Sequence, residues 1–247
     1  MGLLDNESIP RRKMTLFFLI DKSGSMFGKK IGSVNDAIEN VLPLIGEISD
    51  ENPDAEINVA ALEFSTGTRW LYDEPKGAKE FIWQQVEAEG MTSLGEACSE
   101  LNTKLSRSGF MSTPSGCFAP AIILLSDGGP TDNFEAGLAQ LRNNSWFKNA
   151  IKIAIAIGDD ADKDVLKEFT GSLEAVITVH NLDALKKMIR IIAITSSQIG
   201  SKSSSATDET KQEQVIKEVQ QQAQDVDGAE AANTAAPASG DSYDDWD

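Results

Sequence analysis

From residue 14 to about residue 200, short runs of apolar, often β-branched residues alternate with longer stretches in which apolar residues recur every three or four positions. The short runs are typical of buried strands, and the longer stretches are typical of helices with one apolar face. Their alternation predicts a mostly parallel sheet with helices on both faces. The expected fold class is therefore α/β, with a single doubly wound sheet.

The apolar runs expected to form parallel strands are residues 15–20, 121–125, 151–157 and 175–179. Residues 57–64 and 70–72 flank Gly67 and are expected to form a hairpin at one side of the sheet. Apolar residues at helical spacing between Ile31 and Ile48 predict a long helix, which Pro43 should kink or divide. Ser93, followed three residues later by Glu96, predicts a capping box at the start of another helix.

The composition changes at about Gly200. Residues 201–247 contain 11 acidic and 3 basic residues and few large aliphatic ones, so they are expected to be a largely disordered acidic tail. Valines at positions 215, 219 and 226 share one helical face, which predicts a short helix within 208–226 that forms against a partner. The predicted organisation is an N-terminal extension (1–13), one domain (14–199) and the tail (200–247).

The net charge of -17 excludes proteins that coat nucleic acid phosphates or anionic membranes. No apolar run reaches the length of a membrane span or of a signal peptide, which favours a cytoplasmic protein. Two cysteines cannot make a disulfide framework, and Cys98 lies in the apolar stripe of a predicted helix, where a buried thiol is expected.

Oxygen-bearing side chains follow two of the predicted parallel strands. Asp21, Ser23 and Ser25 come directly after the first strand, and Asp127 follows the strand at 121–125. Thr92 lies in the loop before the capped helix. Because ligands bind outside the carboxyl ends of strands in open α/β sheets, these residues are candidates for one site.

All of these donors are oxygens, which suit Mg²⁺, Mn²⁺ or Ca²⁺ and argue against Zn²⁺. Two carboxylates and three hydroxyls leave the ligand shell of Mg²⁺ incomplete, so an acidic side chain from another molecule can complete it. A dication placed between an acidic protein and an acidic partner allows the two to bind.

The segment Asp21-Lys22-Ser23-Gly24-Ser25 resembles the DxSxS motif of von Willebrand factor A domains, and Thr92 and Asp127 match the family's second- and third-loop residues. The resemblance covers roughly residues 14–197. It implies a metal-ion-dependent adhesion site, in which Ser23, Ser25 and Thr92 bind Mg²⁺ directly while Asp21 and Asp127 act mainly through water.

Within that family, residues 126–132 and the Ser/Gly/Pro-rich loop before them look most like bacterial TerY-type proteins. This resemblance implies a metal-bridged adaptor in a tellurite-resistance or stress-response system, beside a protein kinase and a PP2C-type phosphatase. It implies no catalysis. The alternatives are a structural subunit that docks through its C-terminal tail and, less favoured, a metal-assisted hydrolase, for which the sequence offers no obvious general base.

Plainer interpretations exist for several of these residues. Asp21, Ser23 and Ser25 taken singly could be ordinary helix caps. The segment from Gly24 to Lys30 superficially resembles a phosphate-binding loop, but its glycine spacing is one residue short of a Walker A loop. Lys29 and Lys30 are instead expected to begin a solvated helix.

Four other polar residues also have plain structural interpretations. His180, the only histidine, is expected to lie at the surface or to cap a strand. Asp159 and Asp160 are expected to cap the helix that follows them rather than to border the metal. Asp132 is expected to form a turn, with a role as a secondary metal ligand as the alternative.

Overall fold

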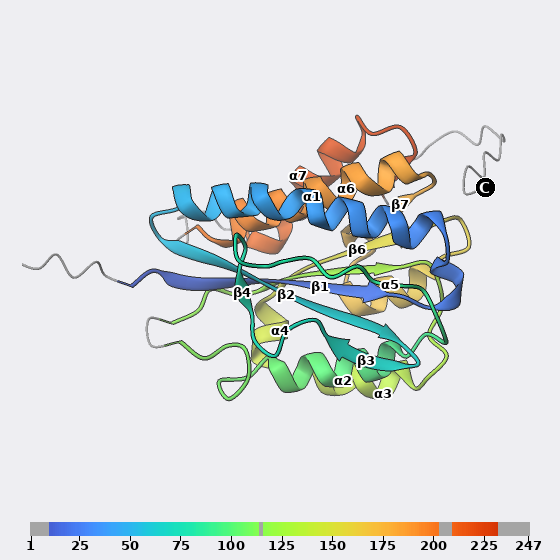
Figure 1. Ribbon diagram of the computed structural model, residues 1–247, viewed down its shortest axis with the longest axis horizontal. Helices are drawn as coiled ribbons and strands as arrows, with labels where there is room; N and C mark the ends of the chain where they lie inside the picture. The colour runs from blue at the N-terminus through green and yellow to red at the C-terminus, as the bar shows by residue number, and fades with distance from the viewer. Residues whose placement is uncertain (1–9, 114–115, 203–208, 232–247) are drawn as a thin grey trace, which may run out of the picture.

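An eight-stranded sheet forms the centre of the molecule and separates two layers of helices (Figure 1). The computed structural model describes residues 10–113, 116–202 and 209–231. The strands are β1 (Arg12–Asp21), β2 (Ala55–Ser65), β3 (Gly67–Trp70), β4 (Lys76–Gly77), β5 (Ala121–Ser126), β6 (Ile151–Ile157), β7 (Val176–Val179) and β8 (Ala229–Ala231). The helices are α1 (Lys29–Glu51), α2 (Leu94–Lys104), α3 (Phe134–Leu141), α4 (Ser145–Asn149), α5 (Lys163–Thr170), α6 (Leu182–Gly200) and α7 (Lys211–Ala223), with short 3-10 helices η1 (Gly24–Met26) and η2 (Leu173–Ala175).

The strands lie in the order β3-β2-β1-β5-β6-β7-β8, and β4 also pairs with β2. The five strands from β2 to β7 in this order are parallel, with Met14 opposite Ile57 and Ala121 opposite Ile151. β3, β4 and β8 are antiparallel to their neighbours. The predicted doubly wound, mostly parallel sheet is confirmed, and the predicted hairpin is β2 with β3, although its second strand begins at Gly67.

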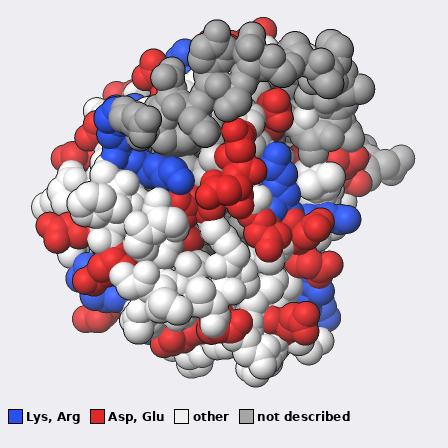
Figure 2. All heavy atoms as spheres, turned by 90° about the vertical axis from the view of Figure 1, so that its right-hand side faces the viewer, with Lys and Arg blue, Asp and Glu red and all other residues white. Residues whose placement is uncertain are grey.

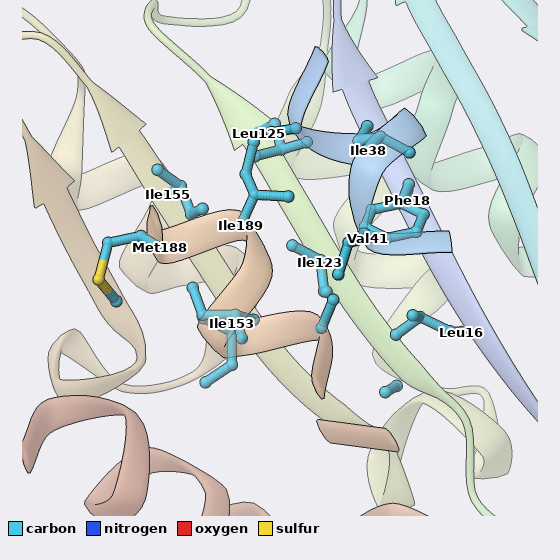
Figure 3. Packing of buried hydrophobic residues seen from close by; sticks show 14 of the residues in the cluster. Leu16, Phe18, Ile38, Val41, Ile123, Leu125, Ile153, Ile155, Met188 and Ile189 are labelled. Atoms are coloured by element: carbon cyan, nitrogen blue, oxygen red, sulfur yellow. The ribbon is translucent and has the colours of Figure 1, made fainter. Parts of the chain in front are cut away.

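Two apolar cores lie on opposite faces of the sheet because successive side chains of a strand point to opposite sides. Leu16 and Phe18 of β1 pack with α1 and α6 (Figure 3), whereas Phe17 and Leu19 pack with the helices of the other layer. The thiol of Cys98 belongs to this second core, and burial raises its pKa to about 12. This agrees with the expected buried thiol.

The long helix α1 is not divided at Pro43. It continues from Lys29 to Glu51, and Pro43 lies on its exposed side. A proline there leaves one helix carbonyl without its usual donor, but water can supply that hydrogen bond on the exposed side.

The described part of the tail is packed onto the domain. A capping box formed by Thr210 and Glu213 starts α7, and Val215 and Val219 of this helix are fully buried in the core that contains α6. Gln212 adds two hydrogen bonds to the main chain of Lys152 in β6 (2.6 and 2.9 Å). The predicted helix therefore exists, but the surface it packs against belongs to its own chain, and β8 then extends the sheet beside β7.

Residues 1–9 of the predicted N-terminal extension and residues 203–208 and 232–247 of the predicted tail lie outside the described residues, whereas Arg12 and Lys13 belong to β1. Among the described helices, none combines the length and the hydropathy that a membrane span requires.

Candidate metal site

Three loops meet at the edge of the sheet where the parallel strands end, on the right-hand side of Figure 1. The first loop follows β1 and contains η1, the second precedes α2, and the third follows β5. Gly24 N donates to Gly90 O (3.1 Å), which joins the first loop to the second. Thr131 N donates to Thr92 O (2.9 Å), which joins the third loop to the second. The segments that carry the predicted ligands are thus held together by backbone hydrogen bonds.

The Asp21 carboxylate is fully buried and accepts two hydrogen bonds. Ser23 N donates to its Oδ1 (2.8 Å), and Ser126 Oγ donates to its Oδ2 (2.6 Å). Burial raises the pKa of Asp21 to about 6, because removal from water disfavours the charged form, and the hydrogen bonds oppose that rise. A nearby cation would compensate the cost of keeping this carboxylate ionised.

Asp127 lies on the other side of the two serines. Ser25 Oγ donates to Asp127 Oδ1 (2.7 Å), and the Oγ atoms of Ser23 and Ser25 are 3.0 Å apart. Lys30 Nζ, from the first turn of α1, donates to Asp127 Oδ2 (2.8 Å). The Asp127 side chain is fully buried, and that of Lys30 is 15% exposed. The expectation of a solvated Lys30 is therefore wrong, whereas Lys29 is exposed as expected.

Thr92 is fixed through its main chain. In addition to the bond from Thr131 N, the Thr131 hydroxyl lies 3.1 Å from Thr92 N and 3.3 Å from Thr92 O. The Thr92 side chain is buried, and its hydroxyl forms no hydrogen bond with any residue that the structure describes. This hydroxyl is therefore available as a ligand.

The donor set fits a hard dication. It consists of two buried carboxylates and three hydroxyls, all oxygens, as Mg²⁺ prefers. Residues 10–113, 116–202 and 209–231 contain no group of three or more His, Cys, Asp and Glu side chains that could hold a metal. A metal held by this donor set would also need oxygen ligands from water or from another molecule. The assignment of Asp21, Ser23, Ser25, Thr92 and Asp127 as the metal ligands stays a prediction.

Asp132 has a role that the sequence analysis did not identify. Its carboxylate accepts hydrogen bonds from Gly95 N (2.9 Å) and Glu96 N (2.8 Å), at the start of α2. The predicted capping box is wrong, because Ser93 forms no side-chain cap and its Oγ instead accepts a long hydrogen bond from Gly67 N (3.4 Å). Asp132 thus caps α2 from the third loop and ties that loop to the second.

His180, Asp159 and Asp162 form contacts outside the five predicted ligands. His180 Nδ1 forms a hydrogen bond with Asp159, and its Nε2 lies 3.4 Å from Glu230 Oε2, so this side chain connects the loop after β6 to β8. Asp162, not Asp159 or Asp160, is the N-cap of α5. Gly28, which has φ of 82°, immediately precedes α1. Because Lys30 contacts Asp127, the segment from Gly24 to Lys30 gains no support as a phosphate-binding loop.

Comparison with known proteins gives the same fold. The model of the von Willebrand factor type A domain matches residues 15–191. Inter alpha-trypsin inhibitor, heavy chain 4 of Mus musculus is 30% identical over 132 residues, which are 51% of this chain and only 13% of that protein.

Among solved structures, a von Willebrand factor type A protein from Catenulispora acidiphila has a TM-score of 0.57 and 18% identity, covering 76% of this chain and 43% of that one. Proximal thread matrix protein 1 from the mussel byssus, in a structure with a zinc-occupied MIDAS (metal-ion-dependent adhesion site) motif, has a TM-score of 0.57 and 15% identity, covering 76% and 48%. At such identities the structural likeness shows the fold alone.

Proposed function

Because the chain belongs to the von Willebrand factor type A domain family, we propose that it is a metal-dependent protein-binding module. Ser23, Ser25 and Thr92 would bind Mg²⁺ directly, and Asp21 and Asp127 would act mainly through water. The metal would supply a Lewis-acidic centre that an acidic side chain of a protein partner can bind. Mn²⁺ or Ca²⁺ could serve in its place.

The observation that carries this proposal is the pair of buried carboxylates joined through Ser23 and Ser25: Ser23 N donates to Asp21, the two serine hydroxyls are 3.0 Å apart, and Ser25 Oγ donates to Asp127. Two carboxylates, the Lys30 ammonium and a dication leave a single positive charge at the site. One carboxylate from a partner neutralises it, which favours an acidic ligand residue. The zinc-occupied MIDAS motif of proximal thread matrix protein 1 supports a metal at this place in the fold.

The proposed setting is a tellurite-resistance or stress-response system in the bacterial cytoplasm, with a protein kinase and a PP2C-type phosphatase as candidate partners. The resemblance of residues 126–132 to TerY-type proteins supports it. The proposed role requires no catalytic step. A hydrolase would need a general base beside the metal, and both carboxylates there already accept hydrogen bonds from neighbouring groups.

The alternative of a structural subunit that docks through its tail is less favoured by the packing of α7. Val215 and Val219, which would form the docking face, are already buried within the chain.

The test is capture of partners from a native lysate by the full chain, in Mg²⁺ and in EDTA, with identification by mass spectrometry. The Ser23→Ala/Ser25→Ala variant removes two predicted ligands. Ser106→Ala/Ser108→Ala is the matched control, since these hydroxyls have the same spacing and lie 3.2 Å apart on an exposed turn. A partner lost in EDTA and in the first variant, but kept by the control, is the expected result. A partner kept under all conditions would refute the proposal.

A further inference from the structure

Large apolar side chains are exposed beside the candidate metal site. In the described part of the chain, the large hydrophobic residues with the most exposed side chains are Phe27 (80%), Ile82 (73%), Met91 (55%) and Leu173 (41%). Phe27 directly follows η1 in the first loop, and Met91 directly precedes Thr92 in the second. Two of the four therefore border the predicted ligands, one on each of two adjacent loops.

The backbone beneath both side chains is fixed by short contacts. Phe27 N donates to Gly24 O (3.2 Å), and Gly24 N donates to Gly90 O (3.1 Å), so the two loops form one surface. Met91 N donates to the Thr66 hydroxyl (3.0 Å). Gly90 has φ of 75°, and a Cβ there would lie 2.6 Å from that hydroxyl, so only glycine fits. Phe27 and Met91 thus project from an ordered surface, which lowers the entropy lost when a partner binds.

The charges around this surface favour a partner that brings one carboxylate and few additional acidic side chains. Figure 2 looks onto this end of the molecule, where an area without charged side chains is bordered mainly by acidic side chains, with some Lys and Arg side chains among them. The bound dication calls for one carboxylate, whereas the acidic border would repel additional ones. Burying large apolar side chains next to that carboxylate would exclude water and strengthen its bond to the metal.

From this arrangement we infer that Phe27 and Met91 select a partner segment in which the acidic residue is flanked by large apolar side chains. The inference rests on the proposed function, because it concerns the residues around the metal-bound carboxylate. Each of the two contacts should contribute about a tenfold gain in affinity, as expected when a large apolar side chain is mostly buried on binding.

A peptide display library tests the inference with the full chain in Mg²⁺. Each peptide carries a fixed central Glu with three randomised positions on either side, and a matched library carries Gln at the centre. The Phe27→Ser/Met91→Ser variant removes the apolar surface. The control is Ile82→Ser/Leu173→Ser, which removes the other two exposed large hydrophobic residues, beside the middle of α1 and before β7.

We expect the wild type and the control to select large apolar residues next to Glu, and the Phe27/Met91 variant to lose that preference and about 100-fold in affinity for the selected peptides. Glu-dependent, Mg²⁺-dependent binding without apolar selection, or with selection unchanged in the variant, would overturn this inference and leave the proposed function intact. If Glu peptides bind no better than Gln peptides in Mg²⁺, the proposed function itself fails, and the inference fails with it.

Discussion

Lys30 should compete with the metal for Asp127, so the change Lys30→Met should tighten Mg²⁺ binding. The ammonium lies 2.8 Å from Asp127 Oδ2, with the carboxylate fully buried and the lysine side chain 15% exposed, so solvent screens the pair little. A hydrogen bond between charged groups in such surroundings contributes about 1.5–3 kcal/mol. If a metal has to displace the Lys30 ammonium from Asp127, removal of that ammonium should lower the Kd for Mg²⁺ by about 10-fold to 100-fold.

The same change should destabilise the protein in EDTA. Without Lys30, the buried Asp127 carboxylate loses its ion-pair partner, and the free energy of unfolding should fall by about 1.5–3 kcal/mol, or about 3–12 °C in Tm. Titration calorimetry measures the first effect, and thermal unfolding in EDTA measures the second. Lys29→Met is the matched control, because Lys29 is exposed and should change neither quantity. Weaker or unchanged Mg²⁺ binding by Lys30→Met would refute the competition.

Three further predictions concern stability. Val219→Ala, in the fully buried face of α7, should lower the free energy of unfolding by about 2 kcal/mol in urea titrations, whereas the exposed Gln221→Ala should leave it within about 0.5 kcal/mol. Equal stabilities would show that α7 does not belong to the core. Asp132→Ala should lower stability by about 1–2 kcal/mol and speed amide hydrogen exchange at the start of α2, because two backbone donors lose their acceptor; unchanged exchange there would contradict the cap. Burial lowers the pKa of Lys152 from 10.5 to about 8, so between about pH 8 and pH 10.5 the unfolded chain binds a proton that the folded chain has lost, and stability should rise with pH across this window. Lys152→Met should remove that rise, and an identical pH dependence in both proteins would be the contrary result.

The strands of the parallel sheet and the three loops could be predicted because they depend on local patterns. The run from Thr15 to Ile20 is long and apolar enough to indicate a buried strand, and Asp21 follows it at the position where parallel strands place ligands. The boundary of the hairpin was less accurate, since a turn at Gly67 with φ of 93° allows β3 to begin at the turn itself.

The contacts of Lys30 and Asp132 could not be predicted from local patterns. Lys30 is 97 residues from Asp127, and Asp132 caps a helix that begins 38 residues before it in the chain. Ser93 and Glu96 have the spacing of a capping box, but the carboxylate of Asp132 already occupies the backbone donors of that turn. In both cases the fold brings together loops that are distant in the sequence. At α2, the tertiary contact of Asp132 replaces the local capping box that the sequence pattern favours.

The tail illustrates the same limit. The spacing of Val215 and Val219 indicates a helix with one apolar face, but it carries no information on which surface covers that face. The side-chain amide of Gln212 forms hydrogen bonds with both the main-chain N–H and the carbonyl of Lys152, and a glutamine in a polar segment gives no signal of this contact.

We propose that the three loops bind a dication through serine and threonine hydroxyls and two aspartates. Binding of Mn²⁺ to the full chain, followed by electron paramagnetic resonance and competed with Mg²⁺, tests it most directly. We predict a single saturable site that Ser23→Ala/Ser25→Ala abolishes and Ser106→Ala/Ser108→Ala preserves. Absence of saturable binding in the wild type, or equal binding in the two serine variants, would contradict the claim.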